Sequence, residues 1–224
     1  MTRVLRKRAG VRRPGLKSCL VLLFLVARVH AQTFTNLDFE SANLSGYSVG
    51  SVPASDAIPG WTAYLGGTAL TMINYNTSPF SSGYGADILD AGSGHNPHQG
   101  VYEFFVQGGS GSYLVNLGQT GTIPVTARSL FFWAGPLPES PSFDGHALSL
   151  ISLGDGIYGA DISAYAGQTG ELLFKSDFAP FGGGYFLDDI RFSNLPVPEP
   201  GTLGLLALGG MLLGWRLYKT RLSP

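Results

Sequence analysis

The sequence predicts an all-β fold: a two-sheet antiparallel β-sandwich of the jelly-roll kind, preceded by a signal helix and followed by a transmembrane helix. Glycine is abundant, with 32 among 224 residues, and the body lacks runs of the helix-forming residues Lys, Glu and Ala. Short β-branched or aromatic runs recur between turn residues instead. This pattern is typical of a sandwich built from many short strands.

The body between residues 32 and 195 contains eleven such runs at regular spacing, and no internal repeat of fixed period is visible. We therefore predict one extracytoplasmic domain over residues 32–195, which is long enough to bury a core. The predicted strands are Thr33–Glu40, Trp61–Leu65, Ala69–Asn74, Ala86–Asp90, Val101–Val106, Ser112–Leu117, Ser129–Trp133, Ala147–Leu153, Tyr158–Ala164, Glu171–Ser176 and Tyr185–Ser193.

The last predicted strand alternates in a way that singles out one acidic residue. Strict alternation places Phe186, Asp188, Ile190 and Phe192 on one face, which is apolar except for the acid. A carboxylate on a buried face needs a hydrogen-bonding partner or a metal ion. Asp188 is therefore a candidate site residue.

The N-terminus has the three parts of a secretory signal peptide. Residues 1–17 carry seven Lys and Arg, a short apolar run follows, and Val29-His30-Ala31 ends in small residues. We predict cleavage after Ala31, so that residues 1–31 form the signal peptide and Gln32 begins the mature chain. The alternative is an uncleaved membrane anchor, but the apolar run of about nine residues is short for a span.

The charge of the body excludes some partners. Between residues 32 and 195 there are three basic and fourteen acidic side chains, a formal net charge of −11. So acidic a surface repels nucleic acid and anionic lipid head groups, and it is compatible with neutral glycans and divalent cations. The sole cysteine, Cys19, leaves with the signal peptide, so the mature domain has no disulfide.

The C-terminus combines a short motif, an apolar run and a basic end. Pro198-Glu199-Pro200 precedes a predicted transmembrane helix over about residues 201–218, and Arg216, Lys219 and Arg221 provide the charge. Positive charge after the run places the C-terminus in the cytoplasm. The alternative is an ordinary C-terminal anchor, which does not account for the acid between two prolines.

This segment, residues 196–224, resembles the PEP-CTERM sorting signal of Gram-negative bacteria. The resemblance implies transient anchoring in the inner membrane and processing near Pro198-Glu199-Pro200 by exosortase, a membrane-embedded transpeptidase. It also implies delivery to the cell surface or extracellular matrix, often in bacteria that make exopolysaccharide.

The body resembles galactose-binding-like jelly rolls, a fold shared by many carbohydrate-binding modules. The resemblance rests on Asn36-Leu37-Asp38-Phe39-Glu40, Ile58-Pro59-Gly60-Trp61 and Phe186-Leu187-Asp188-Asp189-Ile190. It implies that Glu40 and Asp188 hold a structural Ca²⁺, which prefers several carboxylate and carbonyl oxygens. No other cofactor is expected.

Catalytic patterns are weak by comparison. His95 and His98 lack an obvious third metal ligand, and the sequence of Ser142, Asp144 and His146 lacks a nucleophile elbow. Glu103 with Asp90 would be a carboxylate pair for glycosidase chemistry, but acids are common enough here to pair by chance.

Tyr75 and Tyr84 flank a polar loop, and we predict them as exposed ligand-binding aromatics. The sequence thus predicts a non-catalytic surface or matrix protein that binds exopolysaccharide. A surface glycoside hydrolase or lyase and a purely structural coat or biofilm component are the alternatives.

Overall fold

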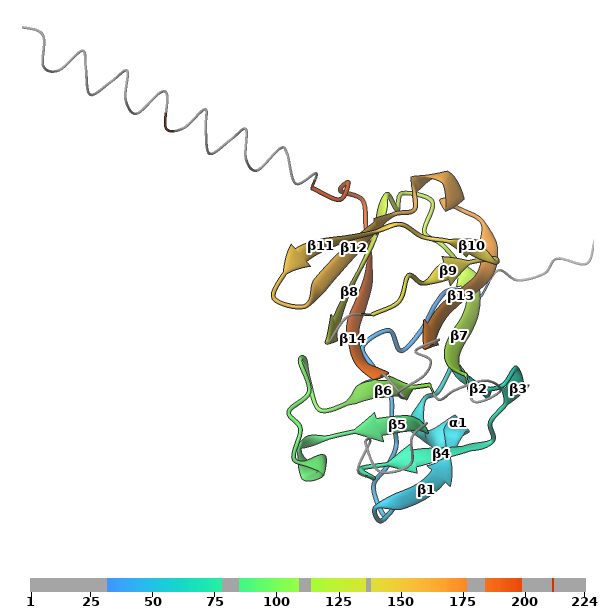
Figure 1. Ribbon diagram of the computed structural model, residues 1–224. Coiled ribbons are helices and arrows are strands. Elements are labelled where there is room, and N and C mark those ends of the chain that lie inside the picture. Colours follow the sequence, from blue (N-terminus) through green and yellow to red (C-terminus); the bar gives the residue numbers. More distant parts are fainter. Residues whose placement is uncertain are drawn as a thin grey trace, which may run out of the picture. The chain divides into compact units, whose positions relative to one another are not determined.

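The computed structural model describes residues 32–77, 85–108, 114–135, 138–176 and 184–198, together with Met211 (Figure 1). The predictions for the signal peptide and its cleavage after Ala31, for Tyr84, for Glu199 and Pro200, and for the transmembrane helix with Arg216, Lys219 and Arg221 lie outside these residues. Within them, no helix is both long and apolar enough to cross a membrane.

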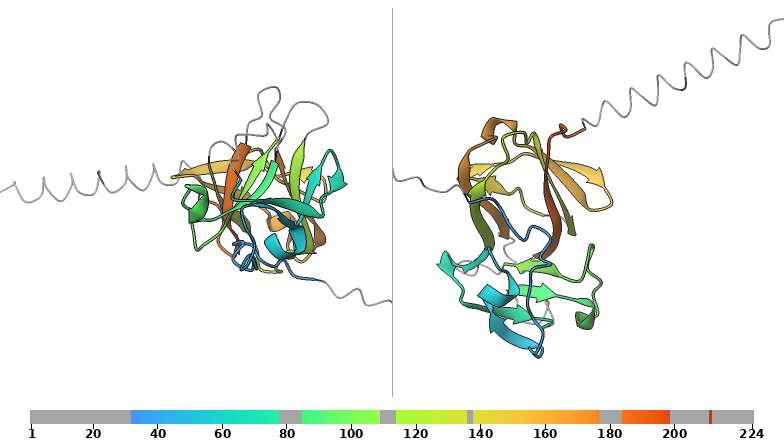
Figure 2. Two further views of the ribbon diagram at one scale, coloured as in Figure 1. Left: turned by 90° about the horizontal axis from the view of Figure 1, so that it is seen from below. Right: turned by 180° about the vertical axis from the view of Figure 1, so that it is seen from behind.

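The described residues form two β-sheets that pack as a sandwich, as predicted (Figures 1 and 2). The large sheet has the order β1 (Gly50–Pro53), β4 (Met72–Tyr75), β5 (Gly85–Leu89), β6 (Glu103–Gln107), β14 (Gly184–Ser193), β8 (Ser129–Gly135), β12 (Ile157–Asp161) and β11 (Leu150–Gly154). The small sheet has the order β10 (His146–Ala147), β9 (Ser142–Phe143), β13 (Thr169–Ser176), β7 (Val115–Thr122), β2 (Thr62–Leu65) and β3 (Thr68–Ala69).

Helical structure within the described part of the sandwich, residues 32–198 with their gaps, consists of short turns: α1 (Ala54–Ala57), η1 (Ala91–Ser93) and η2 (Ser163–Tyr165). The pairs between named strands are antiparallel, apart from the parallel contact of β4 with β5. This arrangement is consistent with a jelly-roll-like domain.

Aromatic side chains connect the two sheets through the core. Phe132 of the large sheet meets Phe174 of the small sheet edge-on, with ring centroids 5.2 Å apart. Trp61 packs on Phe174 at 6.2 Å and on Phe39 at 5.8 Å. Such rings bury large apolar areas, so this chain of contacts contributes strongly to stability.

The prediction of a strand over Thr33–Glu40 is wrong. Thr33 makes an isolated bridge to Thr122, and the chain then turns at Asn36 and Phe39, whose φ angles are 51° and 60°. The turn inserts the Phe39 ring, fully buried, between Trp61 and Phe104. Core packing thus explains the irregular backbone of this segment.

The predicted alternation of the last strand is also wrong, because β14 contains a bulge. Its register with β8 shifts between Asp188 and Arg191, and Asp189 has a φ of 47°. Tyr185 and Leu187 therefore face the core together with Ile190, whereas Phe186 belongs to a second apolar cluster on the opposite face. Asp188 precedes the bulge and lies with Phe186 on that opposite face of the large sheet, whereas the bulge turns Ile190 toward the core.

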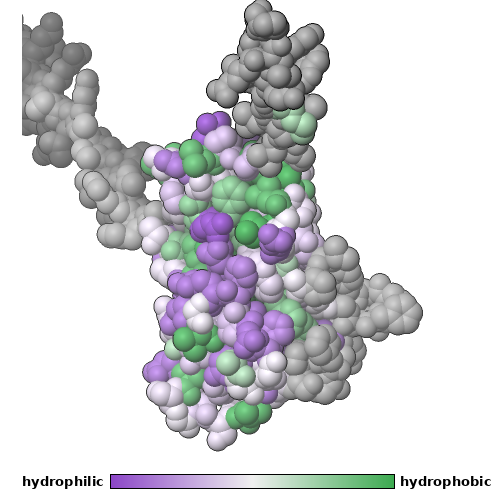
Figure 3. Space-filling model, turned by 90° about the vertical axis from the view of Figure 1, so that its left-hand side faces the viewer, coloured by the Kyte–Doolittle hydropathy of each residue, from purple (hydrophilic) through white to green (hydrophobic). Residues whose placement is uncertain are grey.

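The opposite face of the large sheet carries the functional features described below. Its apolar cluster consists of Leu89, Phe105 and Phe186, with Trp133 packed against it. Elsewhere the surface is mixed: the view in Figure 3 shows hydrophilic residues across the middle of the molecule and separate hydrophobic groups above and below.

Candidate functional site

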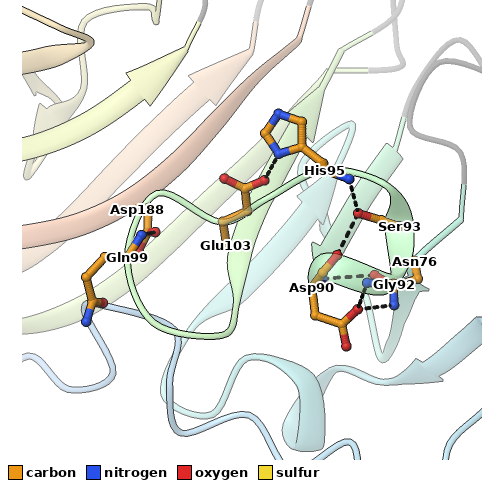
Figure 4. Close-up of polar contacts among 8 residues, drawn as sticks. All are labelled: Asn76, Asp90, Gly92, Ser93, His95, Gln99, Glu103 and Asp188. Carbon is orange, nitrogen blue, oxygen red and sulfur yellow. Dashed lines mark hydrogen bonds and ion pairs between the residues drawn. The ribbon is translucent and has the colours of Figure 1, made fainter.

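The loop between β5 and β6, residues 90–102, covers part of this opposite face. Asp90 caps η1, because its Oδ1 accepts a hydrogen bond from the Gly92 N–H at 2.7 Å. The Ser93 hydroxyl donates to the Asp90 carbonyl at 2.7 Å and accepts from the His95 N–H at 3.1 Å (Figure 4). These bonds fix the start of the loop.

An open hollow of about 450 Å³ lies beside the start of this loop. Tyr75 at the end of β4 donates its hydroxyl to Asp90 Oδ2 at 2.7 Å, and the Asn76 amide donates to Asp90 Oδ1 at 2.6 Å. The hydrogen bond to Asp90 is the main reason that the pKa of Tyr75 is raised to about 12. The residues lining the hollow are Tyr75, Asn76, Asp90, Ala91, Gly92, Gly100 and Val101.

Glu40 holds the other end of the loop. Its Oε1 accepts hydrogen bonds from the backbone N–H groups of Val101 and Tyr102, both at 2.8 Å. Gly100 has a φ of 64°, and a Cβ atom there would overlap the Glu40 carboxyl group. A glycine is thus required at this position both by the backbone conformation and by the close approach of Glu40.

Two carboxyl groups are buried side by side beneath the loop. Leu187 of β14 pairs with Phe104 of β6, so the next cross-strand neighbours are Asp188 and Glu103. Both side chains are fully buried, with 0% exposed. Asp188 accepts from the Gln99 N–H at 2.7 Å and from the Asp189 N–H at 2.7 Å, which ties the loop to β14 (Figure 4).

Burial favours the neutral forms of these acids. It raises the pKa of Glu103 to about 7, against a backbone hydrogen bond from His98. It also raises the pKa of Asp188 to about 7; the N–H groups of Gln99 and Asp189 oppose this rise, and the negative charge of Glu103 adds to it. Two ionised carboxylates here would repel each other in a poorly solvated place.

His95 completes this buried group. Its Nδ1 contacts Glu103 Oε1, and its ring stacks on Phe186 with centroids 3.9 Å apart. Burial lowers the pKa of His95, as it raises that of Glu103, so burial disfavours the charged form of each partner. Glu103 Oε2 is buried without a hydrogen-bond partner among the described residues.

The loop is also held by an aromatic stack. His98 lies over Trp133 with ring centroids 4.6 Å apart, and the Trp133 Nε1–H donates to the Asp155 carbonyl at 3.1 Å. The two histidines therefore anchor the loop on the apolar cluster. No group of three or more His, Cys, Asp or Glu in the described part of the chain could hold a metal ion.

The surroundings of Glu40 and Asp188 do not form a calcium cage in the described residues. Both carboxylates contact the same segment, residues 99–102, so the N-terminal residue Glu40 and the C-terminal residue Asp188 are linked through this loop. Their oxygens, however, accept backbone N–H groups, which point positive hydrogens where a cation would sit. The structure gives these two residues a metal-independent role in holding the loop, and calcium stays a prediction.

The other candidate residues do not assemble into one site. Glu103 is absent from the lining of the hollow, where Asp90 lies, so these two acids do not flank one cleft. Ser142 in β9 is buried, whereas Asp144 and His146 are exposed, and no hydrogen bond joins these three described side chains. Tyr75 lines the hollow, but it is partly buried against the core rather than exposed, and its role in ligand binding stays a prediction.

The chain leaves the sandwich through a docked stem, residues 194–197. The Ser129 hydroxyl donates to the Leu195 carbonyl at 2.6 Å. Val197 is only 9% exposed and lies so close to Gly159 that a Cβ atom there would approach its Cγ1 to 3.0 Å. The stem therefore packs on the large sheet as far as the residue before Pro198, which is exposed.

Sequence reasoning did not find the partnership of Asn76 with Asp90 or that of Glu103 with Asp188. The second left a signal, since each acid lies directly beside a run of apolar residues in its strand, Phe104–Val106 in β6 and Tyr185–Leu187 in β14. The first left none, because Asn76 follows a short strand and resembles any loop amide.

Comparison with known protein families gives a match at the C-terminus. Residues 196–219 match the model of the PEP-CTERM protein-sorting motif, which confirms the resemblance seen in the sequence. Such a motif implies export, transient C-terminal anchoring in the membrane and processing by exosortase before the protein reaches the cell surface. No curated protein matches the chain.

Proposed function

We propose that the β-sandwich delivered by this sorting motif is a non-catalytic surface or matrix protein that binds exopolysaccharide in the hollow beside Tyr75. The hollow carries the proposal. Its volume of about 450 Å³ lies within the range of small-molecule sites. It also combines the aromatic wall and the few fixed polar groups that such sites use to orient a ligand.

The polar groups of the hollow are held before any ligand arrives. Asp90 is fixed by Tyr75, Asn76 and Gly92, and Asn76 Oδ1 in turn accepts from the Asp90 N–H at 2.9 Å. Pre-organised groups lose little conformational entropy on binding, which favours affinity. Sugar hydroxyl groups can both donate to the carboxylate and accept from the amide.

The lining supports a binding role over hydrolysis. A glycosidase flanks the bond it cleaves with two carboxyl groups about 5–10 Å apart. Among the described residues that line the hollow, Asp90 alone carries a carboxylate. A purely structural coat protein is distinguished from this proposal by the absence of any glycan affinity.

The test is a glycan array followed by titration calorimetry on the exported chain purified in detergent. Tyr75→Ala should weaken binding about five- to thirtyfold, as expected for loss of an aromatic contact of about 1–2 kcal/mol. Tyr47→Ala is the matched control, because Tyr47 donates to Asp56 at 2.6 Å and does not line the hollow. Absence of binding to every glycan, or equal binding by both variants, would contradict the proposal.

A further inference from the structure

We infer that the hollow selects glycans bearing free amino groups, because its fixed charge is negative and no described cation neutralises it. This inference rests on the proposed function and specifies the class of sugar. It depends on which charges surround the hollow and on how each is compensated.

Asp90 presents a carboxylate whose hydrogen-bond donors are all neutral: a phenol, an amide and a backbone N–H. Burial alone would raise the pKa of Asp90, but these three hydrogen bonds together outweigh it and lower the pKa below its usual value. The group is therefore ionised at neutral pH. Neutral donors orient this charge without cancelling it.

Glu40 adds a second negative charge next to the hollow. Its carboxylate lies against Gly100 and binds the N–H groups of Val101 and Tyr102, and Gly100 and Val101 belong to the lining. Burial raises the pKa of Tyr102, and the charges of Asp90 and Glu40 raise it further. Both carboxylates thus act on the same tyrosine.

The described cations lie elsewhere. The body has only Arg128, Lys175 and Arg191 as basic residues, and none of them lines the hollow. Arg191 pairs with Asp189 and covers the Phe131 ring, with its guanidinium carbon 5.6 Å from the ring centroid. The net charge of −11 extends the negative potential over the whole body.

A ligand at this position is therefore sorted by charge. Uronate, sulfate or phosphate groups on a sugar would be repelled by Asp90 and Glu40, and a neutral sugar would gain only the hydrogen bonds of its hydroxyl groups, without the attraction between opposite charges. A protonated amino group would gain a charge-assisted hydrogen bond with Asp90 and a favourable contact with the face of the Tyr75 ring. An amino sugar is the glycan that uses every feature of the hollow.

The experiment compares two oligosaccharides of the same linkage and length, in one of which the 2-amino groups are free and in the other acetylated and therefore uncharged. β-1,4-linked glucosamine and N-acetylglucosamine oligomers of equal length are titrated into the exported chain in detergent, at about pH 5.5, where the amines are protonated and low-pKa carboxylates remain ionised. We expect the glucosamine oligomer to bind at least about tenfold more tightly. Raising the salt from about 20 to about 500 mM should remove most of that preference.

Asp90→Asn should abolish the preference, and Asp56→Asn is the matched control, because Asp56 accepts a tyrosine hydroxyl at 2.6 Å away from the hollow. If Asp90→Asn does not fold, the salt dependence of the wild-type chain still tests the inference, because a preference based on charge must weaken as the salt concentration rises. Equal affinity for both oligomers would overturn this inference and leave the proposed function intact. Binding of a linear polyamine as tight as that of glucosamine would also overturn it, and binding of no glycan would overturn both.

Discussion

Replacing Glu103 by glutamine should remove much of the pH dependence of folding stability, because glutamine fills the same place without an ionisable proton. Burial raises the pKa of Glu103 from its ordinary value of 4.5 to about 7. Between these values the folded protein binds more protons than the unfolded chain. The free energy of unfolding therefore falls as the pH rises through this window, and is highest below it.

The magnitude follows from the shift. Each pKa unit is worth 1.36 kcal/mol, so Glu103 alone should cost the wild-type protein about 3 kcal/mol between about pH 4.5 and about pH 8. The Glu103→Gln variant should not show this loss of stability between the two pH values. It should also weaken the dependence contributed by Asp188, whose pKa is raised partly by the Glu103 charge.

Urea unfolding followed by tryptophan fluorescence at both pH values measures the effect, since Trp61 is buried in the core. The quantity to compare is the change in stability between the two pH values for each protein, which does not depend on any fixed cost of the substitution. Glu171→Gln is the control: Glu171 lies on the small sheet, is partly exposed and has the same chemistry. Equal pH slopes in wild type and Glu103→Gln would refute the argument.

Two further predictions concern single contacts. Gly156→Ala should destabilise the fold by about 1–3 kcal/mol more than Gly154→Ala, as measured by thermal unfolding. Both glycines have positive φ, but only at Gly156 would a Cβ atom meet Trp133 Nε1, at 2.6 Å. Equal losses of stability in the two variants would show that the Trp133 side chain moves aside at no cost. Glu40→Gln should cost about 1 kcal/mol, because the glutamine oxygen can still accept from the N–H groups of Val101 and Tyr102 but without the negative charge. A metal-independent role of Glu40 predicts that EDTA leaves the melting temperature of the wild type unchanged. A fall in melting temperature with EDTA would instead support the predicted calcium ion at Glu40 and Asp188.

The fold class and the sorting tail were predictable because each rests on local pattern. Short apolar runs between turns indicate strands wherever they occur, and Pro198 follows the body as the sorting motif requires.

The details of the site were not predictable, because they depend on register between distant strands. Glu103 and Asp188 lie far apart in the chain and meet through the pairing of β6 with β14, which no spacing in the sequence specifies. The bulge at Asp189 is a local choice of φ that reverses which side chains face the core. Phe39 likewise enters the core from a turn, where alternation predicts a strand.

The docked stem determines how much free chain separates the folded sheet from the motif that the processing enzyme reads. Val197 is seated against Gly159, and Pro198, the first residue of the Pro-Glu-Pro motif, follows immediately. One residue of extended chain reaches about 3.5 Å. An enzyme that reads this motif must therefore work against the surface of a folded sheet, or draw Val197 and Leu195 away from it first. The strength of two small contacts, one apolar and one from the Ser129 hydroxyl, would then help to set how readily the protein leaves the membrane.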